Sequence, residues 1–229
     1  MKIFKENSKD FNYDNLTVYM DVDDVLLDST QAVLDIIQER YGVRQAQENI
    51  KDWRFKSAKR DLNSKQIEEI FDSDEFWSKV CLNKTLVDAF KEGLWDKFNW
   101  VFVTKGTEVN LKKKFEYLMQ QSFFQNNSNW SYYRLDSNES KSKVHMVGGI
   151  QVDDLYGNLV NTDADLKILL KNGRDTEFNT PKRKTDNFEN LYFADDMNHI
   201  VSILNWYASL DGEELNEILV NMVTELEEF

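Results

Sequence analysis

One short segment, residues 18–28, constrains the fold of this chain more than any other. It places the apolar run Val18–Met20 directly before a turn that carries Asp21, Asp23 and Asp24. An apolar run that ends in polar residues is typical of a buried strand. Carboxylates this close repel one another unless a cation or a proton neutralises them. The segment predicts an acidic site at the end of a strand, and the alternative is a solvated acidic turn.

Length and composition limit the class of protein. The chain has 229 residues, which suits one α/β domain with an insertion or a small cap. Hydrophobic residues make up 41% and aromatic residues 13%, so we expect a folded globular protein. The formal net charge of −13 disfavours polymeric nucleic acid as a partner, because nucleic-acid sites are basic.

The sequence also bears on the compartment. Cys81 is the only cysteine, so no intrachain disulfide can form and a reducing environment fits. Residues 1–15 are polar and charged, without the apolar segment of a signal peptide, and no apolar run reaches membrane-spanning length. We therefore expect a cytoplasmic protein that does not insert into a membrane.

Strand-like and helix-like stretches alternate along most of the chain. Short apolar runs predict strands at residues 16–20, 100–103, 130–135, 149–152, 166–170 and 191–194. Helical spacing of apolar residues predicts helices at 30–41, 108–121 and 198–208, and residues 122–129 read as a polar loop. This alternation predicts an α/β fold with a doubly wound parallel sheet.

Residues 29–98 differ from the rest because they show helical periodicity without a convincing strand. Helices are expected at 30–41, from Ser64, and at 85–94, with Gly42 as the C-cap of the first. We interpret 29–98 as a helical cap inserted after the first strand, and assign 1–28 and 99–229 to the α/β core. The alternative is that these helices simply flank the sheet.

The end of the chain gives two further predictions. Residues 172–190 are polar and predict an exposed loop, whereas apolar residues at helical spacing predict an amphipathic helix over 213–226. That helix could pack on the sheet or on a second copy of the chain, which leaves a homodimer open.

Four polar signals follow the apolar runs or their connections. They are Asp21 with Asp23, Thr104, Lys143, and Asp153 with Asp154. Ligands of parallel sheets bind at the carboxyl ends of the strands. Phosphoryl transfer through a covalent intermediate needs these residue types: a carboxylate nucleophile, a second acid or base, positive charge and a hydroxyl group.

In their order and types, these motifs resemble those of the haloacid dehalogenase superfamily of phosphatases, whose core is of the Rossmann type. Within that superfamily, the chain looks most like the 5'(3')-deoxyribonucleotidases. The resemblance rests on the helical insert between the first two motifs and on the ten-residue step from Lys143 to Asp153. It covers roughly residues 16–170.

The resemblance implies a role for each matching position. Asp21 would be the nucleophile that becomes an aspartyl phosphate, and Asp23 the acid and base. Thr104 and Lys143 would grip the phosphoryl group. Mg²⁺ would be held by Asp21, the backbone carbonyl of Asp23, and Asp153, with Asp154 close by. A nucleoside monophosphate would be the substrate.

Other positions bear on substrate choice. Phe76 and Trp77 of the insert would line the base pocket, although aromatic residues at helical spacing are equally expected in a core. Lys105 and Lys141 are further candidates for substrate contacts. They depart from the family, which favours a small hydroxyl residue at the first position and arginine at the second.

The motifs leave three alternatives open. A second acidic pair, Asp195 and Asp196, also follows an apolar run and could replace Asp153 and Asp154. The substrate could be another small phosphoester. The fold could also be catalytically idle and serve as a binding module.

Overall fold

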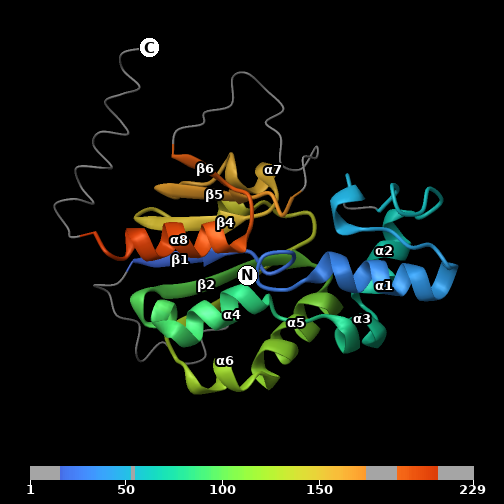
Figure 1. Ribbon diagram of the computed structural model, residues 1–229, viewed down its shortest axis with the longest axis horizontal. Coiled ribbons are helices and arrows are strands. Elements are labelled where there is room, and N and C mark those ends of the chain that lie inside the picture. Colours follow the sequence, from blue (N-terminus) through green and yellow to red (C-terminus); the bar gives the residue numbers. More distant parts are fainter. Residues whose placement is uncertain (1–15, 53–54, 174–189, 211–229) are drawn as a thin grey trace, which may run out of the picture.

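A parallel sheet forms the centre of the molecule. The computed structural model describes residues 16–52, 55–173 and 190–210 (Figure 1). In these ranges, six strands form one sheet in the order β3-β2-β1-β4-β5-β6, and every neighbouring pair is parallel. The strands are β1 (Thr17–Met20), β2 (Asn99–Gly106), β3 (Trp130–Asp136), β4 (Gly149–Asp153), β5 (Leu166–Leu170) and β6 (Leu191–Ala194). The predicted α/β fold with a doubly wound parallel sheet is confirmed.

Helices cover both faces and one end of this sheet (Figure 1). They are α1 (Ser29–Tyr41), α2 (Ser64–Phe71), α3 (Asp74–Lys79), α4 (Lys84–Ala89), α5 (Glu108–Gln120), α6 (Ser122–Asn126), α7 (Tyr156–Leu159) and α8 (Met197–Tyr207). None of the helices in the described part of the chain combines the length and the apolar character that a membrane span requires.

The strand order places β1 at the point where the direction of winding changes. From β1 the chain builds outward through β2 and β3, and then returns to the other side of β1 with β4. Met20 pairs with Phe102 on one side and with Val152 on the other. The residues that follow β1 and end β4 therefore meet at a crevice, which is where ligands bind in sheets of this kind.

The ends of the helices follow from local chemistry. Gly42 adopts the left-handed conformation (φ 69°) that ends α1, as predicted. Asn63 and Gln66 form a reciprocal capping box at the start of α2.

Residues 122–129 were expected to be a loop, but 122–126 form α6. The loop prediction was wrong here because Phe124 is buried against Trp95 and Trp130 and fixes the segment.

The helices of residues 29–98 divide into two groups. Helices α1, α2 and α3 lie together beyond the carboxyl ends of the strands, whereas α4 packs against α8 (Figure 1). One hydrophobic cluster runs from Val18 and Met20 in the sheet to Ile67 and Phe76 in α2 and α3.

The extent of the cap, predicted as 29–98, stays a prediction. The helix predicted at 213–226 and most of the loop predicted at 172–190 lie outside the described residues.

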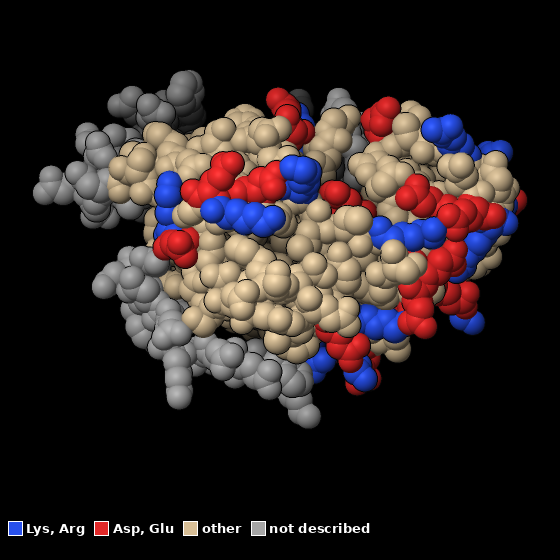
Figure 2. Space-filling model, turned by 60° about the horizontal axis from the view of Figure 1, so that its bottom comes forward, with Lys and Arg blue, Asp and Glu red and all other residues tan. Residues whose placement is uncertain are grey.

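Charged side chains of both signs alternate on the end formed by α1–α3, at the right of Figure 2. Ion pairs join α3 to α1 through Lys79 and Glu39 (2.7 Å), and α3 to α5 through Asp74 and Lys113 (2.6 Å). Such exposed pairs contribute little to stability, and they keep this surface hydrated.

Candidate active site

Two buried carboxylates share one buried ammonium group at the crevice beside β1. Asp21 directly follows β1, and its backbone N–H donates to Val152 O at 2.9 Å. Asp153 ends β4. Lys141 Nζ lies 2.7 Å from Asp21 Oδ1 and 2.6 Å from Asp153 Oδ2. All three residues are buried, with exposed fractions of 8% for Asp21, 0% for Asp153 and 2% for Lys141.

The charges of this group do not balance. Burial raises the pKa of Asp21 to about 7; Lys141 opposes this shift, whereas Asp153 and Asp23 add to it. Burial alone would lower the pKa of Lys141, but Asp153 and Asp21 outweigh it and hold that pKa above its usual value. One ammonium group therefore cannot satisfy both carboxylates, and the site favours a proton or a second cation.

A hard divalent cation fits these residues. One carboxylate oxygen from each of Asp21, Asp153 and Asp154 lies within 4.8 Å of the others. Asp153 is oriented by two donors to its Oδ1, Leu155 N at 3.0 Å and Asn158 Nδ2 at 3.0 Å. An all-oxygen, net negative donor set of this kind suits Mg²⁺ or Ca²⁺.

The alternative acidic pair lies elsewhere. Asp195 and Asp196 follow β6, which is separated from β4 by β5. Asp196 is the N-cap of α8, and its side chain accepts a hydrogen bond from His199 N at 2.9 Å. The structure thus places Asp153 and Asp154, rather than Asp195 and Asp196, beside Asp21.

Asp23 lies next to this group and is held on both carboxylate oxygens. Ser29 Oγ donates to its Oδ1 at 2.9 Å, and Lys114 Nζ contacts its Oδ2. Lys114 also donates to Thr104 Oγ1 at 2.7 Å and is completely buried. Thr104 was predicted to follow a strand over 100–103, but it lies within the longer strand β2; its side chain is fully buried and its hydroxyl accepts a hydrogen bond from Lys114.

Sequence reasoning missed Lys114, although a signal was present. Leu111 and Leu118 are buried on the inner face of α5, and Lys114 lies between them at helical spacing. A charged residue within an apolar stripe is rarely buried unless it is paired. The spacing therefore pointed to a buried partner of opposite charge, without indicating which one.

The lysine that contacts the buried carboxylates is Lys141, which was predicted as a substrate contact, and not Lys143, which was predicted to grip the phosphoryl group. Lys141 and Lys143 belong to the same 3₁₀ turn, residues 141–143. Lys141 points into the site, whereas the side chain of Lys143 is 55% exposed and binds Glu139 at 2.7 Å. Residues two apart on such a turn face different sides. The assignment of phosphoryl contact to Lys143 is corrected: the structure brings Lys141 to this position.

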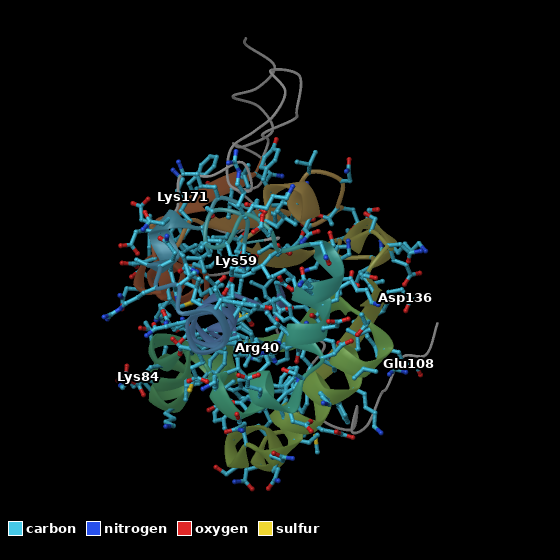
Figure 3. All side chains as sticks on the ribbon, turned by 90° about the vertical axis from the view of Figure 1, so that its right-hand side faces the viewer. Arg40, Lys59, Lys84, Glu108, Asp136 and Lys171 are labelled. Atoms are coloured by element: carbon cyan, nitrogen blue, oxygen red, sulfur yellow. The ribbon has the colours of Figure 1, made fainter. Side chains whose placement is uncertain are left out.

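A cavity of about 520 Å³ opens above Asp21, Asp23 and Lys141. It lies between the sheet and α2, whose Ile67 and Phe71 form an apolar wall. Further lining comes from the end of β2 and the residue after it, Lys105, Gly106 and Thr107, and from the loop after β3, Ser137 and Asn138. Figure 3 views the molecule from this end; Glu108, which begins α5, and Asp136, which ends β3, lie on the same side.

The two aromatic residues predicted for the base pocket do not line this cavity. Phe76 is completely buried and contacts Phe71 and Trp77, with ring centroids 4.9 and 5.0 Å apart. Trp77 Nε1 donates to Phe71 O at 3.1 Å. Both residues support Phe71 from behind, so their assignment to the pocket is corrected. Lys105 and Lys141, the other predicted substrate contacts, do line the cavity.

Comparisons with known proteins bear on the fold. No protein-family model and no curated protein matches the sequence. Among solved structures, Protein Tyrosine Kinase A of Mycobacterium tuberculosis is similar, with a TM-score of 0.57 and 11% identity over 84% of this chain and 99% of that one. A haloacid dehalogenase-like protein of Burkholderia xenovorans LB400 has a TM-score of 0.51 and 13% identity over 86% and 99%.

The fold is haloacid dehalogenase-like. In this haloacid dehalogenase-like fold, Asp21 and Asp153 occupy the crevice on either side of the switch point. Fold similarity at this level of identity does not carry an activity over, so the chemistry has to be argued from the site. The finer resemblance to deoxyribonucleotidases stays a prediction.

Proposed function

We propose that the chain is a Mg²⁺-dependent phosphomonoesterase that forms an aspartyl phosphate on Asp21. One observation carries the proposal: the buried carboxylate of Asp21, which Lys141 bridges to Asp153, lines a cavity that a second carboxylate, Asp23, also lines. Paired titratable groups at a crevice are the usual setting of catalytic carboxylates.

The proposed chemistry assigns one task to each side chain. A carboxylate oxygen of Asp21 attacks phosphorus, and the bond from phosphorus to the ester oxygen breaks. Asp23 protonates the departing oxygen, and then removes a proton from the water that hydrolyses the aspartyl phosphate. Lys141 would contact a phosphoryl oxygen, and its position in the lining of the same cavity as Asp21 supports this role.

Asp21, Asp153, Asp154 and the backbone carbonyl of Asp23 would hold the Mg²⁺. When bound, Mg²⁺ supplies positive charge that offsets the charge of the phosphoryl oxygens. This role suits the site, because Lys141 alone leaves its carboxylates undercompensated.

As substrate, we propose a nucleoside monophosphate, preferably a deoxyribonucleotide. The motif resemblance supports this choice, and a cavity of about 520 Å³ has the size of a typical site for a small molecule. The apolar wall formed by Ile67 and Phe71 offers a surface on which a base could pack. The alternatives are another small phosphoester, or a catalytically idle fold that binds one.

Asp21→Asn tests the proposal. We expect the variant to fold and to lose essentially all turnover, because an amide cannot attack phosphorus. The measurement is phosphate release from p-nitrophenyl phosphate and from a panel of nucleoside monophosphates, with Mg²⁺ or with EDTA. Asp195→Asn is the matched control and should retain wild-type rates.

Three outcomes would contradict this proposal. Turnover by pure Asp21→Asn close to wild type excludes Asp21 as the nucleophile. Full activity in excess EDTA excludes the metal. Hydrolysis of p-nitrophenyl phosphate without hydrolysis of any nucleotide supports the phosphatase activity but excludes a nucleotide as the substrate.

A further inference from the structure

Lys114 is a completely buried lysine whose ammonium group contacts three oxygen atoms at the edge of the site. These are Asp23 Oδ2, Thr104 Oγ1 at 2.7 Å and Lys105 O at 3.3 Å. Removing a charge from water costs several kcal/mol, so an ammonium group is buried only where acceptors surround it. Its three acceptors account for all three of its N–H bonds.

Lys114 does not line the cavity, so its effect on a substrate has to pass through another residue. Of the three residues that Lys114 contacts, Asp23 lines the cavity and carries the opposite charge. The side chain of Asp23 is 30% exposed, so without tethers water could compete for its oxygens and its rotamer would not be fixed. Lys114 from α5 and Ser29 from α1 hold one oxygen each.

We propose that Lys114 is a positioning residue, which holds the Asp23 carboxyl group in the orientation that protonates the departing ester oxygen. The inference rests on the proposed function, since it presumes that Asp23 acts as the acid. Proton transfer in the transition state requires the acid within hydrogen-bond reach of the leaving oxygen. A small rotation of Asp23 therefore costs activity even though all reacting groups are present.

Helix α5, which carries Lys114, is fixed at its start and along its inner face, which suits a positioning role. Thr107 caps the start of α5 by accepting from Asn110 N at 3.1 Å. Leu111 and Leu118, one turn to either side of Lys114, are buried in the core. A side chain that extends from a fixed helix holds its partner more precisely than one on a loop.

Lys114→Met tests the inference, because it keeps much of the length and removes the charge. The readout is kcat/KM for two esters: an alkyl phosphate such as a nucleoside monophosphate, and p-nitrophenyl phosphate. The alkoxide of the first is a poor leaving group and needs a proton, whereas nitrophenolate leaves without one. We expect kcat/KM to fall about 10²-fold or more for the alkyl ester and far less for p-nitrophenyl phosphate.

Lys112→Met is the matched control on the same helix. Lys112 is 72% exposed and lies 3.7 Å from Glu116, so its replacement should leave both rate constants unchanged. Lys114→Arg should recover part of the loss on the alkyl ester, because it restores a cation to Asp23. If Lys114→Met fails to fold, Lys114→Gln replaces it, since its amide can still donate to Thr104.

A double-mutant cycle with Asp23→Asn separates positioning from general damage. If Lys114 acts through Asp23, adding Lys114→Met to Asp23→Asn should not change the ratio of the two kcat/KM values any further. Two results would overturn the inference: an equal loss of kcat/KM on both esters in Lys114→Met, or the same ratio of the two kcat/KM values in Lys114→Met and Lys112→Met. Neither result would contradict the proposed phosphatase function. A wild type that hydrolyses neither ester contradicts the proposed function itself.

Discussion

At the scale of single residues, Lys141 and Lys143 have opposite environments although they are two positions apart. Lys141 is 2% exposed and bridges two carboxylates, whereas Lys143 makes one exposed ion pair with Glu139. Removing one member of a buried ionic group leaves the others unpaired, which costs far more than loss of a surface pair.

Lys141→Met should therefore destabilise the metal-free protein strongly. We expect the free energy of unfolding to fall by about 3–5 kcal/mol, as for other buried ion pairs that lose one partner. Lys143→Met should change it by no more than about 0.5 kcal/mol. Urea unfolding in EDTA measures both, and phosphatase assays should show a loss for Lys141→Met alone. Equal effects of the two substitutions would show that Lys141 is not the buried cation of the site.

The residues that the sequence located best are those fixed by strand order. Asp21 and Asp153 follow recognisable apolar runs, and parallel strands bring their ends to one edge, so their proximity was predictable. Lys141 and Lys143 were not distinguishable, because the direction of a side chain in a turn depends on backbone angles that spacing does not give. Lys114 contacts Asp23 across 91 positions, and no local pattern specifies such a pairing.

Asp24 has an unusual backbone conformation within the acidic turn. It adopts a left-handed conformation with φ 56°, which residues other than glycine rarely adopt. Its carboxylate accepts hydrogen bonds from the backbone N–H and the hydroxyl of Thr30, near the start of α1. Aspartate is among the residues that adopt this conformation most readily, and these two hydrogen bonds offset its strain.

At the scale of secondary-structure elements, the first turns of α5 hold the junction between α2 and α3. Thr107 Oγ1 donates to Asp72 Oδ1 at 2.6 Å, and Asn110 Nδ2 donates to Phe71 O at 3.1 Å. Lys113 Nζ donates to Asp72 O at 2.8 Å. Phe71 and Asp72 both line the cavity, so this contact fixes the wall opposite Asp21.

Thr107→Val should loosen that wall while keeping the shape of the side chain. The substitution removes the N-cap of α5 and the hydrogen bond to Asp72, and loss of a cap costs about 1 kcal/mol. We expect an increase in KM for the proposed nucleotide substrate that exceeds the change in kcat, because the wall would contact the base and not the reacting phosphoryl group. Thr107→Ser retains the hydroxyl and is the control. A Thr107→Val variant with wild-type KM and stability would refute the role of this contact.

The elements themselves were largely readable from the sequence. The strands at 130–136 and 166–170 and the helices at 29–41 and 108–120 lie within a residue or two of their predicted bounds, because each has clear periodicity. The short helices α3, α6 and α7 were not predicted. Elements this short show too little periodicity to be recognised, and tertiary packing decides their conformation.

At the scale of the whole molecule, α1–α3 do not have a core of their own. Their buried residues, such as Ile37 and Phe76, belong to the same cluster as Val18 in β1. A continuous core makes these helices a fixed part of the site.

The imbalance of charge in the site couples the stability of the whole molecule to pH. In the metal-free protein, burial raises the pKa of Asp21 from 3.8 to about 7. Between about pH 4 and pH 7, the unfolded chain is ionised at Asp21 while the folded protein still holds the proton. The folded state then binds more protons, so the contribution of Asp21 to the free energy of unfolding falls as pH rises through this interval.

Mg²⁺ should reverse this loss, and more so at higher pH. The ion requires the ionised carboxylate and must displace the proton at low pH, so its apparent affinity should be greater at pH 8 than at pH 5.5. At a hundredfold excess over its Kd, the stabilisation amounts to about 2.7 kcal/mol. Thermal unfolding with Mg²⁺ and with EDTA at the two pH values measures the effect. Asp153→Asn should lose most of the shift, and Asp195→Asn should keep it. A shift in Tm that is the same at both pH values, or that Asp153→Asn retains in full, would mean that the ion binds away from Asp21 and Asp153.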